Sequence, residues 1–173
     1  MTYANPTEPG PIRTLFSFPN PVNEVAARLV AAMVVILSLV IIATGAWWLM
    51  VVLVYGFLAR VLTGPTLSPM GLLATRGLVP LLGREARLVP GPPKRFAQTV
   101  GLAFSTTALV LYLVLDSMTA SRIVLGVLTV FAVLESGLGF CAGCFVFNHL
   151  MRLGLIPESV CQECLAVGAP GTQ

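Results

Sequence analysis

Four long, nearly uninterrupted apolar segments limit how this chain can fold. They cover residues 25–44, 47–63, 96–115 and 122–150. About 20 helical residues cross the hydrocarbon core of a bilayer, because each residue adds about 1.5 Å along the helix axis. Lipid offers no hydrogen-bond partner to exposed backbone groups, so membrane-crossing segments of this kind are helical. The sequence therefore predicts an all-α integral membrane protein whose four transmembrane helices form two hairpins.

Composition supports a membrane environment. The 173 residues are 57% hydrophobic and only 10% charged, whereas soluble domains carry about 25% charged residues. An ordinary water-soluble domain is therefore excluded, and the lipid bilayer is the first partner that we expect. So few charges also argue against nucleic-acid binding through a basic face.

The basic residues are distributed unevenly along the predicted helices. Nine of the ten lysines and arginines would lie on the side that holds both termini and the long middle segment, and only Arg122 on the other. Lysine and arginine concentrate on the cytoplasmic side of membrane proteins. We therefore expect a cytoplasmic N-terminal segment over 1–24, a transmembrane domain over 25–150, a cytoplasmic connection over 64–95 and a cytoplasmic, cysteine-containing tail over 151–173.

The connection between the two hairpins contains a further helix signal. Ser68 is a favourable N-cap, and Pro69 is a favourable first helical residue. The residues that follow mix leucine with small, polar and basic side chains, which is typical of a short helix lying in the membrane surface. This interfacial helix would either contact anionic lipid or dock a cytoplasmic partner.

Four cysteines form two C-x-x-C pairs, Cys141 with Cys144 and Cys161 with Cys164. Sixteen residues separate the pairs, a spacing found in four-thiolate metal sites. The first pair would lie at the inner end of the fourth span, with both thiols on one helix face. Because the cytoplasm is reducing, we do not expect a permanent disulfide.

Three roles are open for these cysteines. As a dithiol relay, they would exchange electrons or sulfur with a soluble protein, with Cys144 attacking as the thiolate and Cys141 resolving. As a structural metal site, or staple, all four would bind zinc or iron and fix the C-terminal tail to the fourth span, with His149 as an alternative ligand. In the third reading, Cys141 and Cys144 serve only as small packing residues.

Glu135 is the only acidic residue deep within a predicted span, and ionisable groups in such positions are functional candidates. Arg60 and Glu135 each lie 13 residues after the predicted outer end of their segments. Equal helix rise would place both side chains at one depth, within reach of an ion pair. Either this pair or a protonated Glu135 bonded to Ser136 or Thr129 would stabilise packing. Alternatively, Glu135 would carry protons for the thiols.

Gly139 and Gly143 are spaced four residues apart in the same segment. This spacing lets helices approach closely, either within one chain or in a homodimer. Sequence motifs for nucleotide binding, serine-histidine catalysis and metalloprotease chemistry are missing. Hydrolase and nucleotide-driven functions are therefore not expected.

Several short stretches together resemble the family known as domain of unknown function 4395, a group of small bacterial membrane proteins. The matching stretches are Val22-Asn23-Glu24 with Ala27-Arg28, Leu67-Ser68-Pro69, Lys94 to Gln98 followed by Gly101, and Gly139 to Cys144. The resemblance implies a four-span protein of the bacterial inner membrane. The residues that it assigns to the shared pattern are Asn23, Glu24, Arg28, Arg95, Gln98, Cys141 and Cys144.

Relatives of this kind often appear linked with thioredoxin-like and rhodanese-like sulfurtransferases, and the layout is similar to four-span membrane redox partners of the DoxX type. That association favours a thiol-disulfide oxidoreductase or sulfur-transfer component that works with a cytoplasmic partner. Its working residues would be Cys141, Cys144, Cys161, Cys164 and Glu135. The alternatives are a scaffold stapled by zinc or iron and a small transporter with Glu135 as its proton site.

Overall fold

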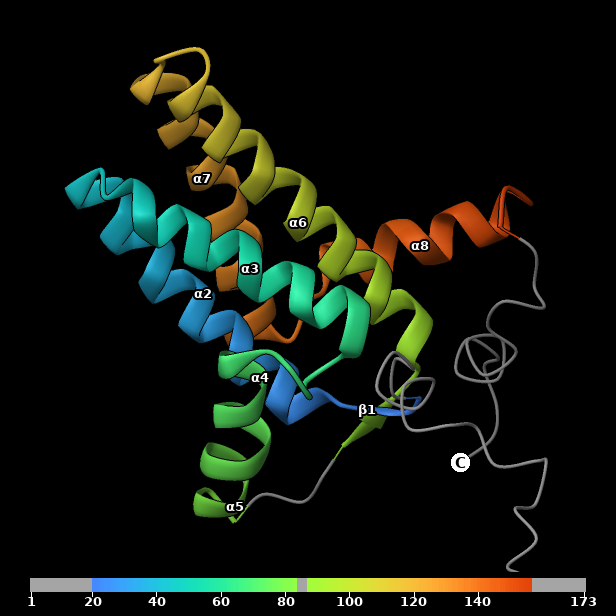
Figure 1. The fold of residues 1–173 in the computed structure, drawn as a ribbon. Coiled ribbons are helices and arrows are strands. Elements are labelled where there is room, and N and C mark those ends of the chain that lie inside the picture. The colour runs from blue at the N-terminus through green and yellow to red at the C-terminus, as the bar shows by residue number, and fades with distance from the viewer. Residues whose placement is uncertain (1–19, 84–86, 157–173) are drawn as a thin grey trace, which may run out of the picture.

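Two antiparallel helical hairpins pack side by side and form the centre of the molecule (Figure 1). The computed structural model describes residues 20–83 and 87–156 of the 173. The elements of the hairpins are α2 (Glu24–Thr44), α3 (Trp47–Thr63), α6 (Gly91–Leu113), α7 (Met118–Val133) and the π-helical turn η2 (Leu134–Leu138) that continues α7. The shorter elements lie at one end of this bundle and are β1 (Val22–Asn23), α4 (Pro69–Leu72), the π-helical η1 (Leu73–Leu78), α5 (Val79–Leu81), β2 (Leu88–Val89) and α8 (Ala142–Arg152).

Three of the long helices have the length and hydropathy of membrane spans, namely α2, α6 and the run Met118–Leu138 formed by α7 and η2. Helix α3 is also apolar but has 17 residues. The bounds of α2 and α3 agree with the first two apolar segments, because Gly45, with a φ of 68°, ends α2 and leaves only a two-residue turn. The predicted helical architecture is therefore confirmed, with three helices of membrane-spanning length in the described part of the chain.

The fourth apolar segment is not one helix, in contrast to the single span expected over 122–150. Its first helix begins at Met118 and ends at Leu138, and Gly139 then adopts a φ of 70°. Such a left-handed residue ends a helix, and glycine adopts this conformation without steric cost. After the turn, α8 runs away from the bundle in another direction (Figure 1). The first cysteine pair therefore lies at the start of a separate helix.

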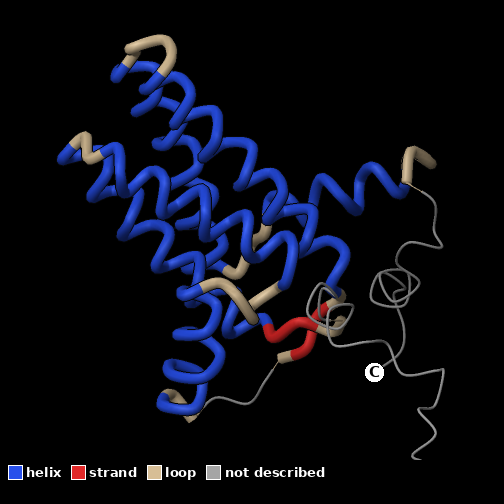
Figure 2. The backbone as a smooth tube through the Cα atoms, viewed as in Figure 1, coloured by secondary structure: helices blue, strands red, loops and turns tan. Residues whose placement is uncertain are grey.

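A two-stranded ladder, which the sequence did not predict, joins the starts of the two hairpins (Figure 2). Strand β1 pairs with β2 in antiparallel fashion, with Val22 opposite Val89. The backbone N–H of Glu24 then donates to the carbonyl of Arg87, at 2.7 Å. The ladder thus brings the first residues of α2 close to the segment that leads into α6.

Small residues let the four long helices pack closely. Ser38, Ser105 and Ser121 are almost fully buried, and the Ser121 hydroxyl donates to the carbonyl of Ala108 at 2.8 Å. Small and locally hydrogen-bonded residues of this kind are typical of helix interfaces in membranes. The main core cluster consists of Val34, Ile41, Met50, Leu53, Phe57, Ala108, Leu125, Leu128 and Ala132.

Residues 69–81 form one short helical run, made of α4, η1 and α5, beside the start of α2. The side chain of Ser68 accepts a hydrogen bond from the N–H of Gly71, and Pro69 is the first helical residue. Both observations agree with the cap that the sequence predicts. Ala74 is fully buried in a cluster with residues from the first turns of α2.

A glycine determines how closely α8 approaches α6. A Cβ built on Gly143 would lie 2.6 Å from both the Cα and the Cβ of Ala97. The two helices therefore meet at backbone distance, and this contact holds the neighbouring Cys141 at the end of the bundle. The close approach expected at this glycine occurs within the chain.

We predict that Gly143→Ala lowers the free energy of unfolding by about 1–3 kcal/mol, the usual cost of overpacking. The matched control is Gly126→Ala in α7, where a Cβ would meet nothing within 4 Å and alanine is the better helix former. Denaturant unfolding of the purified proteins in detergent compares the two variants. Wild-type stability of Gly143→Ala would contradict the tight α6–α8 contact.

Candidate functional site

An arginine from the first hairpin holds the turn that precedes the cysteines. Arg28 of α2 donates from Nη2 to the carbonyl of Gly137, at 2.7 Å, and from Nε to the carbonyl of Ser136, at 3.3 Å. Carbonyls in the last turn of a helix have no partner within the helix and need an outside donor. Arg28 supplies these donors and thereby stabilises the helix end at Leu138.

Asn23 and Glu24 support the same region from the start of α2. The side chain of Asn23 caps the helix by accepting a hydrogen bond from the N–H of Val25, at 2.9 Å. The carboxylate of Glu24 forms an ion pair with Arg87, at 3.5 Å. A Cβ on Gly139 would lie 3.3 Å from Oε1 of Glu24, so the turn packs directly on this carboxylate. The start of α2 and the turn therefore form one supporting unit.

Cys141 is the N-cap of α8, and Cys144 lies in the first turn of this helix. The sulfur of Cys141 accepts a hydrogen bond from the backbone N–H of Cys144, at 3.3 Å. The free N–H groups at a helix start carry partial positive charge and stabilise an anion placed there. Both cysteines are free thiols and both are partly buried. This geometry favours the thiolate form of Cys141.

The two thiols differ in acidity. A hydrogen bond from the Cys144 thiol, together with the positive charge of Lys94, lowers the pKa of Cys141, although burial and the Glu135 carboxylate act in the opposite direction. The same hydrogen bond and burial raise the pKa of Cys144. Cys141 is therefore the more acidic of the two thiols, which reverses the order expected from the sequence.

Lys94 and Glu135 form an ion pair at this end of the bundle, with 2.8 Å between Nζ and Oε1. Their side chains are 8% and 22% exposed. The predicted ion pair of Glu135 with Arg60 is wrong, because Lys94 lies closer and takes the carboxylate, although Arg60 and Glu135 line the same cavity as the equal-depth argument expects. The start of α6 supplies the partner at that depth. Ser136 and Thr129 donate to backbone carbonyls of their own helix instead.

Arg60 is 3% exposed and lies near enough to Glu135 for their charges to interact. Its guanidinium lies over the ring of Phe57, 4.5 Å from the centroid, and its Nη1 contacts the sulfur of Met70 at 4.0 Å. Nε and Nη2 of Arg60 have no hydrogen-bond partner among the described residues. A buried cation with two unused donors is costly in a folded protein.

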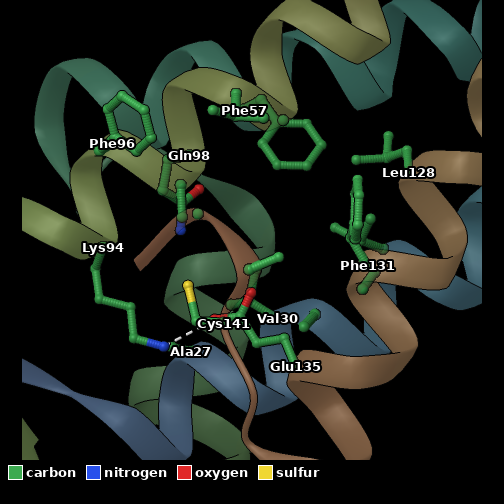
Figure 3. A pocket seen from close by; sticks show the side chains of 18 of the residues that line it. Ala27, Val30, Phe57, Lys94, Phe96, Gln98, Leu128, Phe131, Glu135 and Cys141 are labelled. Carbon is green, nitrogen blue, oxygen red and sulfur yellow. Dashed lines mark hydrogen bonds and ion pairs between the residues drawn. The ribbon is translucent and has the colours of Figure 1, made fainter. Parts of the chain in front are cut away.

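A cavity of about 260 Å³ lies between the four long helices, and Arg60, Lys94, Glu135 and Cys141 are part of its wall. Figure 3 shows Cys141, Lys94, Gln98 and Glu135 around one part of this space, with the sulfur of Cys141 turned into it. The rest of the wall is mainly aliphatic and aromatic. The Cys141 sulfur therefore faces a largely apolar space with a polar end.

The predicted four-cysteine metal site includes Cys161 and Cys164, which lie outside the described residues. Within residues 20–83 and 87–156, no group of three His, Cys, Asp or Glu side chains is placed to hold a metal ion. His149, the alternative ligand, lies on α8 with its ring stacked on that of Phe145, at 6.4 Å between centroids. The zinc or iron site stays a prediction.

Two residues of the site carry little signal in the sequence. Lys94 belongs to a basic stretch that is typical of a membrane surface, yet it is only 6% exposed. Gln98 lies one turn further along α6, and its Oε1 is buried without a donor in the described structure. The prolines at the start of α6 are the available signal, because they begin the helix early enough to include Lys94 in its first turn.

These features define a class of small helical proteins with membrane-length helices and a C-x-x-C pair at the end of the bundle. The chain belongs to the family described as domain of unknown function (DUF4395), whose model matches residues 22–152. This result confirms the resemblance noted in the sequence. No curated protein and no solved structure matches the chain. The matched range begins with β1 and ends with α8, so it includes Cys141 and Cys144.

We predict that Lys94→Met raises the pKa of Cys141, because it removes a positive charge that favours the thiolate. Below that pKa a smaller fraction of Cys141 is ionised, so alkylation by iodoacetamide slows at a given pH and its profile moves to higher pH. Peptide mass spectrometry after timed labelling identifies the modified cysteine. Lys94→Arg should retain the wild-type profile, and so should Arg122→Met at the other end of the bundle. If the pH profile of alkylation in Lys94→Met matches that of the wild type, Lys94 does not influence the pKa of Cys141.

Arg28→Met should lower the free energy of unfolding by about 1–3 kcal/mol, because two helix-end carbonyls lose their donors. Amide hydrogen exchange in the turn around Gly139 should also accelerate. Arg76→Met, at an exposed position of η1, is the control and should change neither quantity. Wild-type stability and exchange in Arg28→Met would show that the turn does not depend on this arginine.

Proposed function

We propose that the chain is a multi-pass protein of the bacterial inner membrane in which α2, α3, α6 and α7 all cross the bilayer. The 17 residues of α3 extend over about 25 Å, a length that a locally thinned bilayer accommodates. Trp47 and Trp48 at its start are 52% and 57% exposed. Exposed tryptophans of this kind fit the aromatic belt at a membrane surface.

Charge supports an orientation with the cysteine end of the bundle in the cytoplasm. Arg122 lies at the opposite end, near the start of α7. The described basic residues at the cysteine end are Arg28, Arg60, Arg76, Arg87, Lys94, Arg95 and Arg152. The positive-inside rule then assigns both termini to the cytoplasm. In this orientation residues 69–81 would lie in the membrane surface, where exposed Leu73, Leu81 and Leu82 contact lipid.

We propose further that Cys141 and Cys144 exchange electrons with a soluble thioredoxin-like or rhodanese-like partner. The observation that carries this proposal is the hydrogen bond from the Cys144 N–H to the Cys141 sulfur at the start of α8. Lys94 adds a positive charge beside that sulfur, and Glu135 holds Lys94 in place. A stabilised thiolate with a second thiol in reach is what thiol-disulfide exchange requires.

Each exchange conserves atoms and electrons. The Cys141 thiol releases its proton, and the resulting thiolate attacks one sulfur of a partner disulfide, whose other sulfur leaves and takes a proton. Cys144 then gives up its proton, attacks the sulfur of Cys141 and releases the partner as a dithiol. The pair loses two electrons and two protons, and the partner gains them. A reducing partner drives the same steps in the reverse direction.

The second cysteine pair has a separate place in this proposal. Cys161 and Cys164 lie outside the described residues and beyond the matched family range. As a tail on the cytoplasmic side, they would pass electrons between the first pair and the partner. In a sulfur relay, the Cys141 thiolate would instead accept a sulfane sulfur as a persulfide. Glu135 has a positioning role in both versions, because it orients Lys94.

The test uses oxidised glutathione and the purified full chain, in a background that carries Cys161→Ser and Cys164→Ser. In this background Cys144→Ser should accumulate a stable glutathione adduct on Cys141, because the resolving thiol is missing. With Cys144 present, the adduct should be transient and end as a Cys141–Cys144 disulfide. Mass spectrometry of the intact protein and its peptides measures both species.

Cys141→Ser in the same background is the matched control, and its Cys144 should react many times more slowly. Equal adduct formation in both single variants, or no internal disulfide when both thiols are present, would contradict the proposed exchange. The unmodified chain is also analysed for metal. One tightly held zinc per chain without disulfide formation would favour the stapled scaffold.

A further inference from the structure

The cavity between the helices has two ends of different chemistry. Phe57, Phe96, Phe104 and Phe131 contribute aromatic rings to its wall, and Phe104 and Phe131 meet edge to face with centroids 6.2 Å apart. A dry cavity of about 150 Å³ is enough to hold benzene. The volume of about 260 Å³ in this structure therefore accommodates a substituted ring.

The polar end of the cavity has unused hydrogen-bonding capacity. Arg60 contributes two buried donors without acceptors, and Gln98 contributes a buried acceptor without a donor, among the described residues. Figure 3 shows Gln98 and the Cys141 sulfur turned toward the same space. A ligand with both ring character and oxygen atoms at its edge would satisfy these groups.

The buried donors of Arg60 suit an oxygen acceptor on the ligand. Lys94 and Glu135 already pair with each other at 2.8 Å, so Arg60 is the wall residue with unused donors among the described residues. A carbonyl oxygen accepts hydrogen bonds from Arg60 without adding charge.

The position of the cavity indicates how such a ligand arrives. Phe131 and Val146 line the cavity and are also 39% and 46% exposed on the outer surface. Phe131 lies within the membrane-length run Met118–Leu138. In the proposed orientation the wall at Phe131 faces lipid, and a ligand dissolved in the bilayer would enter there.

We propose that the cavity binds the head group of a membrane quinone, with a carbonyl oxygen hydrogen-bonded to Arg60, and that this quinone oxidises the Cys141–Cys144 dithiol. This inference rests on the proposed thiol exchange for its redox step. One S–S bond forms, two S–H bonds break, and two electrons and two protons reduce the quinone to the quinol. Gln98 then accepts a hydrogen bond from a quinol hydroxyl. The protein would thus connect a soluble thiol partner to the membrane quinone pool.

The binding test separates the cavity from the thiol chemistry. Isothermal titration calorimetry in detergent measures decylubiquinone binding to the full chain with Cys141→Ser and Cys144→Ser, in which no electron transfer occurs. We expect saturable binding with one site per chain. Arg60→Met should weaken it at least about tenfold, because a charged donor to a buried acceptor is lost. Ala132→Phe, which places a ring in the cavity, should abolish it, and Arg122→Met should leave it unchanged.

A cooperative thermal unfolding transition in each variant shows that the variant is folded. Gln98→Leu, which changes no charge, is a second substitution that should weaken decylubiquinone binding. Absence of saturable binding in the parent protein would overturn the quinone site, whatever the glutathione experiment gives. Parent-like affinity in both Arg60→Met and Ala132→Phe would also overturn it. Oleate that binds more tightly than decylubiquinone and displaces it would identify a lipid site instead, and so overturn the proposal.

The redox test uses the reduced chain with both thiols present and follows quinol formation by absorbance. One decylubiquinol per Cys141–Cys144 disulfide is the expected stoichiometry. Binding without quinol formation would overturn the electron transfer. A failed glutathione exchange with intact quinone binding would overturn only the proposed function.

Discussion

The hydrogen bonds from Arg28 to the carbonyls of Ser136 and Gly137 connect the first hairpin to the end of the second. Carbonyls in the last turn of a helix have no partner within the helix, and Arg28 supplies donors to two of them. Once the helix stops at this point, the left-handed Gly139 redirects the chain and Cys141 becomes the first residue at the start of α8. The position of the reactive sulfur therefore follows from a contact between the two hairpins.

The same end of the bundle concentrates charge in a chain that has very little of it. Two cations, one carboxylate, one amide and one thiol group line a cavity whose other walls are apolar. The Lys94–Glu135 pair is costly to bury, and it lies next to the sulfur whose ionisation it influences. Arg60 lies beside this pair with donors that no described residue uses. Such an arrangement contributes little to stability, and we interpret it as serving chemistry at Cys141.

The long helices could be predicted because a bilayer imposes a simple length and hydropathy on each segment. The bounds of α2 and α3 agree with the apolar segments, and the Ser68 cap could be identified from local preferences alone. The end of α7 could not be predicted, since Gly139 lies inside a continuous apolar stretch and its conformation depends on a contact with Arg28. The depth of Glu135 relative to Arg60 could be predicted, but its ion-pair partner could not, because the burial of Lys94 is a tertiary property.

The candidate site, like the fold, could be predicted only in part from the sequence. The C-x-x-C spacing identified Cys141 and Cys144, but their different surroundings follow from the helix start at Ala142, which no local pattern indicates. Lys94 was hidden among basic residues of the connection, since burial is a tertiary property. Gln98 stood out only through the family pattern, and the structure adds the cavity into which it projects.

The most direct measurement of the central claim is an equilibrium redox titration of the purified full chain. Samples are equilibrated in mixtures of reduced and oxidised dithiothreitol, trapped with maleimide and counted by mass spectrometry, with metal measured in parallel. We predict one reversible two-electron transition assigned to Cys141 and Cys144, with no stoichiometric metal released on oxidation. A pair that stays reduced in every mixture, or that gives up one zinc per chain as it oxidises, would contradict the account.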